Sequence, residues 1–122
     1  NIAVIGWIQP RKAQDIISKA FIEIKGCNLE EDNIVKFPDA KTDRGVKHVK
    51  ELIKAKEDGY LAYIIIVIQM KDVLYFTPNI ERHKEFKDVL KEADEKGVKI
   101  LAYDSIVNID NIKLNKPVKV VL

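Results

Sequence analysis

The sequence predicts a single α/β domain built on a mixed sheet flanked by helices. Its 122 residues are the size of one ordinary domain, and a hydrophobic fraction of 47% is enough to form a core. Segments whose apolar residues have the spacing of strands and of helices follow one another along the chain, in the order strand, helix, strand, helix, strand. The segment from Tyr60 to Gln69 is almost wholly apolar and β-branched, which is typical of a central strand covered on both faces.

The spacing of the apolar residues changes abruptly within the first 25 residues. Residues 1–8 are short and apolar and favour a buried strand, and apolar residues at helical spacing then predict a helix from Pro10 to Phe21. From Phe21 to Lys25 apolar and charged residues alternate, which predicts a strand with one solvent-exposed face. Connections usually take about 2–6 residues, and none separates these two patterns. The sequence therefore predicts either a natural deletion or a missing segment near residues 21/22.

The remaining elements have recognisable boundaries. Thr42 can cap a helix with Asp43 in its first turn, and Gly59 follows the last turn. Asn79 can cap another helix that packs Ile80 inward. Further strands are predicted at Val73–Phe76, Val98–Tyr103 and Ser105–Ile109.

Composition excludes several classes of protein. A single cysteine cannot form an internal disulfide and fits a reducing cytoplasm. The longest apolar run, nine residues from Tyr60 to Ile68, is too short for a membrane helix, so no membrane partner is expected. The net charge is only +2, but Lys36 to Lys56 holds seven basic residues against three acidic ones. This local excess predicts a phosphate-binding surface; the alternative is a solvated helix face.

Glu23 and Lys25 are the first candidates for chemistry. Residues two apart on a strand project from the same face, about 6–7 Å apart along the chain. The carboxylate can hold a divalent cation, and the ammonium can position a water or stabilise charge on a phosphate. The alternative is an ordinary ion pair on a protein surface.

The start of the second helix is the other candidate. Arg44, Lys47 and His48 fall in its first turns, where free backbone N–H groups already attract anions. Asp39 precedes the helix and could orient Arg44 or Lys47. These four residues are predicted to bind nucleic acid. The alternative is a capped surface helix in which His48 lies at the edge of the buried stripe and is hydrogen-bonded locally.

Three segments together resemble a known family. They are Phe21-Ile-Glu-Ile-Lys-Gly, Phe37-Pro-Asp-Ala-Lys-Thr-Asp-Arg-Gly-Val-Lys-His and Gly97-Val-Lys-Ile-Leu-Ala-Tyr. From about Phe21 to Leu122 the chain is similar to the sugar fermentation stimulation protein A (SfsA-like) family. The resemblance implies a restriction-endonuclease-like fold, with Glu23 and Lys25 in the (D/E)xK positions of a PD-(D/E)xK site. Residues 1–122 would be the family's C-terminal nuclease-like domain, without its N-terminal OB-type barrel.

The resemblance also implies DNA as partner, Mg²⁺ or Mn²⁺ as cofactor and a regulatory role in sugar metabolism. A site of this type needs a second acidic residue, which the family carries in a Ser-Arg-x-Asp-Phe type segment that this sequence lacks. Asp15 is the only acidic residue before Glu23, so the two are the predicted metal ligands. The prediction is a cytoplasmic DNA-binding protein, with a homodimer as an open option. The alternatives are an active Mg²⁺-dependent DNA endonuclease and a protein-interaction module without nucleic acid.

Overall fold

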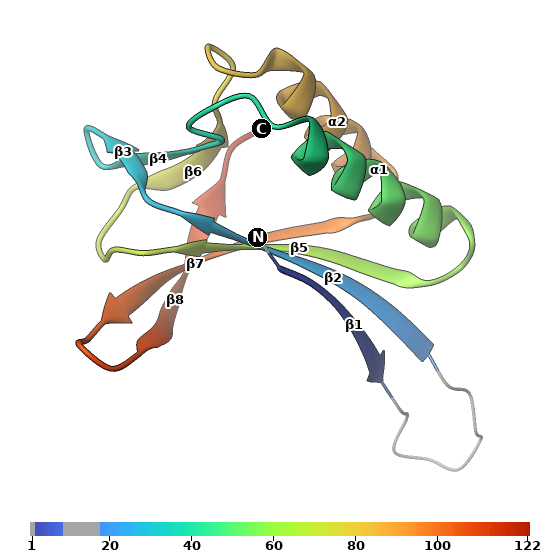
Figure 1. Cartoon of the computed structure of the whole chain (residues 1–122), viewed down its shortest axis with the longest axis horizontal. Helices are drawn as coiled ribbons and strands as arrows, with labels where there is room; N and C mark the ends of the chain where they lie inside the picture. The colour runs from blue at the N-terminus through green and yellow to red at the C-terminus, as the bar shows by residue number, and fades with distance from the viewer. Residues whose placement is uncertain (1, 9–17) are drawn as a thin grey trace.

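The computed structural model describes residues 2–8 and 18–122, with side chains from Ala20 onward. Two helices lie against a curved sheet (Figure 1). In chain order the elements are β1 (Ile2–Ile8), β2 (Ser18–Cys27), β3 (Leu29–Glu31), β4 (Ile34–Phe37), α1 (Asp43–Glu57), β5 (Leu61–Ile68), β6 (Tyr75–Pro78), α2 (Lys84–Glu95), β7 (Lys99–Val107) and β8 (Ile112–Val120).

In the described part of the chain the strands form one mixed, eight-stranded sheet, in the order β1-β2-β5-β7-β8-β6-β4-β3. Strands β2, β5 and β7 are parallel, whereas β1 and β8 run antiparallel to β2 and β7. Helix α1 lies in the connection from β2 to β5, and α2 connects β6 to β7. Parallel strands need such crossovers, so the predicted α/β class with a mixed sheet is confirmed. Neither helix is long and apolar enough to cross a membrane.

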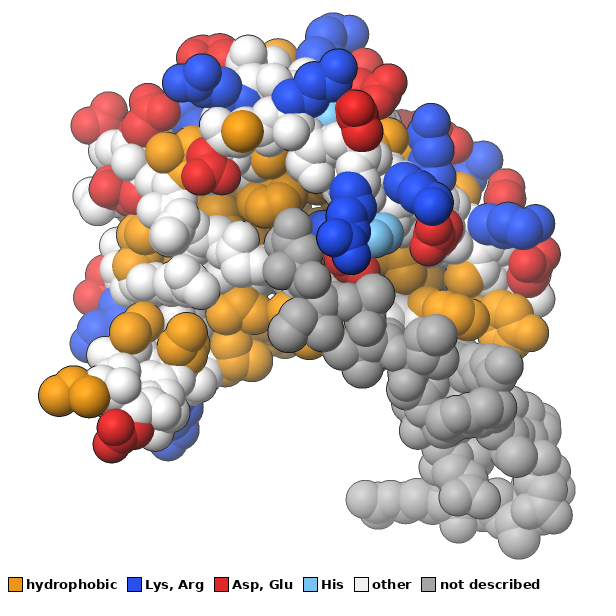
Figure 2. All heavy atoms as spheres, viewed as in Figure 1, with side chains coloured by type: hydrophobic (Ala, Val, Ile, Leu, Met, Phe, Trp, Pro, Cys, Tyr) orange, Lys and Arg blue, Asp and Glu red, His pale blue; other side chains and the backbone are white. Residues whose placement is uncertain are grey.

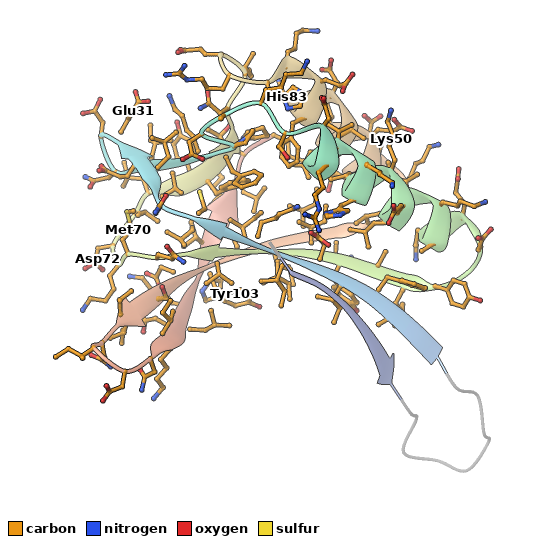
Figure 3. All side chains as sticks on the ribbon, viewed as in Figure 1. Glu31, Lys50, Met70, Asp72, His83 and Tyr103 are labelled. Atoms are coloured by element: carbon orange, nitrogen blue, oxygen red, sulfur yellow. The ribbon has the colours of Figure 1, made fainter. Side chains whose placement is uncertain are left out.

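Both helices cover the same face of the sheet (Figure 1). Along β5, Ile64 and Ile66 point toward the helices and are fully buried, whereas Tyr63 and Ile65 on the opposite face are half-buried. Figure 3 shows Tyr103 of β7 on that opposite side as well. The prediction that the central strand is covered on both faces is therefore wrong for the described residues. A continuous apolar run does not reveal which of its faces receives a helix.

The predicted first helix is also wrong where it can be compared. Ser18 to Phe21 belong to β2, which continues without interruption to Cys27. All four residues pair with β1, and Ala20 and Phe21 pair with β5 as well, so the ladder overrides their helical spacing. Residues 9–17 lie outside the described residues. The abrupt change of period thus falls inside one strand, and a missing segment near 21/22 stays a prediction.

Helix α1 begins as the sequence predicts. The Thr42 hydroxyl accepts a hydrogen bond from the Gly45 backbone N–H at 2.9 Å, and Asp43 occupies the first turn. A Cβ on Gly45 would lie 2.8 Å from the Thr42 methyl group, so this position requires glycine. Gly59, at φ +92°, follows the helix in the left-handed region. Val49 and Ile53 pack the helix onto the sheet.

Helix α2 begins four residues later than a cap at Asn79 would place it. His83 is the N-cap residue, and the helix starts at Lys84. Asn79 is buried, and its side-chain amide donates to the Pro38 carbonyl oxygen at 3.0 Å. Ile80, predicted to face the core, is 49% exposed. Asn79 therefore ties the loop before α1 to the segment after β6 instead of capping a helix.

The later strands differ from the predicted ones in position or length. The segment Val73–Phe76 corresponds to β6 at Tyr75–Pro78, and the two predicted strands from Val98 to Ile109 form the single strand β7. A register irregularity between Tyr103 and Ser105 divides its pairing with β8. The side chains of the charged and apolar residues in this hairpin project below the helical layer (Figure 2).

Candidate functional site

Strand β2 places Glu23 and Lys25 on the face of the sheet that α1 covers. Glu23 is paired with Ile64 of β5, and Lys25 with Ile66. Because residues in register share a face, both charged side chains lie among the residues that form the core. Glu23 is 2% exposed and Lys25 1%. The predicted solvent-exposed face is therefore wrong: the charged side of β2 is the buried side.

Three polar groups meet there. Lys25 Nζ lies 2.9 Å from Glu23 Oε1. His48, from the second turn of α1, brings its Nδ1 to 3.0 Å from the same oxygen and 3.3 Å from Lys25 Nζ. The structure thus joins two predicted residues of the strand with one predicted residue of the helix. We call Glu23, Lys25 and His48 the buried charge cluster.

The proton of His48 decides how this cluster is bonded. The Lys25 ammonium has donors only, so it donates to Glu23 Oε1. The Nδ1 atom of His48 either donates its proton to Glu23 or accepts one from Lys25, since one ring nitrogen cannot do both. In either form Glu23 receives a cationic partner. Taking one partner away would leave a buried charge without compensation, which costs about 3–5 kcal/mol.

The other predicted nucleic-acid-binding residues are exposed on or near α1. Arg44 lies four residues before His48, hence on the same side of the helix, and Lys47 is its neighbour. Asp39 is exposed in the loop before α1. Within residues 20–122, no hydrogen bond or ion pair links Asp39 to Arg44 or Lys47, so the predicted orienting contact is wrong. Asp15, the predicted metal ligand, lies outside the described residues.

Cys27 lies on the same face of β2, two residues beyond Lys25, and is 3% exposed. Its thiol donates to the Lys36 carbonyl oxygen at 3.0 Å. Burial, with a smaller contribution from the negative charge of Asp39, raises the pKa of Cys27 to about 12. Because the thiolate is the reactive form, this cysteine is not a nucleophile at neutral pH.

We expect Cys27 to react slowly with Ellman's reagent at pH 8 in the folded protein and rapidly in urea. The unfolded thiol ionises near pH 9, whereas the folded thiol stays protonated to about pH 12. Its contribution to the free energy of unfolding is therefore complete below pH 9 and is lost as the pH rises to 12. Fast labelling of the native protein would contradict the raised pKa of Cys27. The variant Cys27→Ser has no thiol and gives the background signal.

A second polar group, which the sequence patterns did not reveal, joins the starts of the two helices. Ligand atoms of Asp43, His83 and Glu85 lie within 4.8 Å of one another. His83 is 6% exposed, and Figure 3 shows it at the same end of the helical layer as the start of α1. Among the described side chains, its Nε2 is the buried polar atom that has no hydrogen-bond partner.

The hydrogen bonding of His83 opposes a metal at this group. The Thr42 backbone N–H donates to His83 Nδ1 at 3.2 Å, so the ring proton resides on Nε2. A protonated nitrogen has no lone pair for a cation, although Glu85 Oε1 lies 3.9 Å from it. Loading a metal would require breaking the Thr42 contact. The arrangement therefore fits a structural link between the helix starts.

Charges of both signs cover the helical layer. Figure 2 shows Lys and Arg side chains interspersed with Asp and Glu over this face. Between the last turns of the helices, Lys96 lies 3.2 Å from Glu57 and 3.3 Å from Glu92. These pairs give Glu57, in the last turn of α1, a cationic partner. Arg44 and Lys47, at its start, have no such partner among the described residues and keep their charge available.

Known proteins of similar sequence identify the family. Residues 11–111 match the family model described as the sugar fermentation stimulation protein RE domain. A sugar fermentation stimulation protein homolog of Clostridium beijerinckii is 57% identical over 104 residues, which are 85% of this chain and 46% of the relative. The homolog of Ruminiclostridium cellulolyticum is 59% identical over 102 residues, 84% of this chain and 45% of the relative. The chain thus spans about half the length of these relatives.

A solved structure shares the fold. The structure of Pyrococcus furiosus SfsA in complex with Ca²⁺ matches with a TM-score of 0.80 and 29% sequence identity, over 98% of this chain and 56% of that one. The expected restriction-endonuclease-like α/β fold is confirmed. With a family model that covers most of the sequence, this chain belongs to the SfsA family and corresponds to its RE domain.

Proposed function

We propose that this chain is a DNA-binding domain with a PD-(D/E)xK-type nuclease-like site. The observation that carries the proposal is the buried charge cluster, which lies directly under the start of α1. Glu23 and Lys25 have the spacing of the (D/E)xK pair, and His48 connects them to a helix start that also carries Arg44 and Lys47.

DNA phosphates would meet the exposed groups first. Arg44 and Lys47 supply charge, and the N–H groups of the first turn of α1 that Thr42 does not bind supply donors. Glu23 and Lys25 lie below them and are almost fully covered by described residues. A phosphate can thus be held by α1 without entering the buried charge cluster. We therefore place DNA binding ahead of cleavage in the proposed function.

The cluster partly fits the divalent cation that the fold implies. The Glu23 carboxylate is a suitable oxygen ligand, and it already has a cationic partner, Lys25, at 2.9 Å. The Pyrococcus furiosus protein, solved in complex with Ca²⁺, supports a cation in a related protein. A bound Mg²⁺ or Mn²⁺ would supply charge stabilisation at a phosphoryl oxygen. Lys25 would donate a hydrogen bond to the phosphate or to the attacking water.

We expect the double change Arg44→Gln/Lys47→Gln to weaken binding of every duplex DNA sequence alike. Removing two phosphate contacts should make the slope of log K against log salt shallower by about 2. Fluorescence anisotropy of a labelled duplex over a salt series measures this slope. The matched control is Lys113→Gln/Lys119→Gln, which removes two exposed lysines from β8 and leaves α1 unchanged. An unchanged slope in the first variant would contradict the proposed interface.

An active Mg²⁺-dependent endonuclease is the second candidate, and the short Glu23–Lys25 contact is what favours it. Nicking of supercoiled plasmid, with Mg²⁺, Mn²⁺ and no metal, separates it from binding alone. Cleavage that Lys25→Met abolishes would establish the enzyme. Binding without cleavage leaves the proposed function. The absence of both would favour a protein-interaction module.

The names of the curated relatives support a further part of the proposal. They are called sugar fermentation stimulation protein homologs. We therefore include a regulatory use of DNA binding in sugar metabolism. The cytoplasm is the proposed compartment, because DNA is accessible there and the reduced thiol of Cys27 is compatible with it.

A further inference from the structure

We propose that His48 is a metal ligand and that its Nδ1 forms, with Glu23 Oε1, a two-atom seat for a divalent cation of the Mn²⁺ class. The inference rests on the proposed function, since it identifies the missing ligand of the same site. It differs from the sequence-based prediction, which made His48 a phosphate contact and Asp15 the partner of Glu23.

The spacing of the two atoms fits this role. His48 Nδ1 and Glu23 Oε1 are 3.0 Å apart. Ligand atoms at about 2.1 Å from a cation and at right angles to one another are separated by about 3.0 Å. The two side chains come from elements that cannot drift apart, since β2 is paired on both sides and α1 packs on the sheet. The seat is thus already formed.

Lys25 competes with a cation for the same two atoms. Lys25 Nζ contacts both atoms, at 2.9 Å from Glu23 Oε1 and 3.3 Å from His48 Nδ1. A positive group therefore already lies beside the oxygen and the nitrogen. When Lys25 donates to His48, the ring proton is on Nε2 and Nδ1 keeps a lone pair, which is the tautomer that binds metals. The Lys25 ammonium has to withdraw from both Glu23 Oε1 and His48 Nδ1 as the cation enters.

The described residues offer Glu23 no other partner ligand. Helix α1 and the loop before it carry other acidic residues. These are exposed and make no described contact with Glu23: Asp39, Asp43 and Glu51. A site with one imidazole nitrogen and one carboxylate prefers transition metals, whereas Mg²⁺ and Ca²⁺ prefer oxygen alone. We therefore expect the 122-residue chain to bind Mn²⁺ more tightly than Mg²⁺.

Mn²⁺ titration followed by electron paramagnetic resonance tests the seat without DNA or turnover. We expect one bound Mn²⁺, with a nitrogen hyperfine coupling in the pulsed spectrum. His48→Asn puts an amide group near the position of Nδ1, so it should abolish that coupling and lower the Mn²⁺ affinity at least tenfold. The preference for Mn²⁺ over Mg²⁺ should fall as well, an effect that a purely structural histidine would not produce.

His83→Asn is the matched control, because it changes the chain's other histidine and the one next to Asp43 and Glu85. It should leave the affinity and the nitrogen coupling unchanged. Loss of the coupling in His83→Asn, or its persistence in His48→Asn, would overturn the inference. So would the absence of Mn²⁺ binding by folded wild-type protein at millimolar concentrations. The proposed function has a separate test: it would be contradicted if the salt dependence of DNA binding were unchanged in Arg44→Gln/Lys47→Gln.

Discussion

The change Glu23→Ala is expected to lower the free energy of unfolding by about 3–5 kcal/mol, because it leaves the Lys25 ammonium buried without its carboxylate. Lys25 is 1% exposed, and Glu23 Oε1 is its acceptor at 2.9 Å. His48 Nδ1, at 3.3 Å, can accept one hydrogen bond but brings no negative charge. Urea denaturation monitored by circular dichroism measures the loss.

A paired substitution separates the cost of an uncompensated charge from the cost of lost packing. Glu23→Leu/Lys25→Met removes both charges and keeps most of the volume, so it should recover most of the stability that Glu23→Ala loses. Glu51→Ala, on the exposed side of α1, should change the free energy by no more than about 0.5 kcal/mol. If the double variant were as unstable as Glu23→Ala, the buried pair would not be the cause.

The change Asp104→Ala is expected to cost about 3 kcal/mol of unfolding free energy. Asp104 is fully buried in β7. One carboxylate oxygen accepts from the Lys116 backbone N–H at 2.9 Å, and the other from the Asp72 backbone N–H at 3.4 Å. Hydrogen bonds to a charged group contribute about 1.5–3 kcal/mol each, and the alanine would leave two backbone donors to find new partners.

The loss of stability in Asp104→Ala should begin with local opening around residue 104. Asp104 joins the turn after β5 to β8, beside the register irregularity between Tyr103 and Ser105. Amide hydrogen exchange should therefore rise first at Asp72 and Lys116, before the parallel centre of the sheet opens. Asp104→Asn, which keeps one carbonyl oxygen, should lose less stability than Asp104→Ala. Equal stability of the alanine variant and the wild type would contradict this role.

Strand β2 is where prediction and structure differ most instructively. The alternation of Ile22, Glu23, Ile24 and Lys25 correctly predicts a strand. It misidentifies the buried side, because hydrophobicity normally marks the face that points inward. Here a helix covers the charged face. The ion pair between Glu23 and Lys25 and the contact of Glu23 with His48 replace the solvent that the charges lose. Local pattern contains no information about such a tertiary partner.

His48 shows the same limit of prediction from local sequence. Its position at the edge of the apolar stripe of α1 leaves its contact unspecified, since sequence spacing does not say which strand lies below. Thr42, by contrast, caps α1 as predicted, because a cap depends on residues only three positions apart. Asn79 has the same capping chemistry but bonds to the Pro38 carbonyl across 41 residues.

By itself the sequence determined the α/β class, the start of α1, the basic excess around it and the family resemblance. These follow from short-range periodicity, from capping and from a long motif. Only the tertiary structure decided that both helices share one face of the sheet, that Glu23 and Lys25 are buried, and that His48 lies 3.0 Å from the Glu23 carboxylate. The physical reason is that burial and ion pairing depend on which elements stack, and stacking is a property of the whole chain.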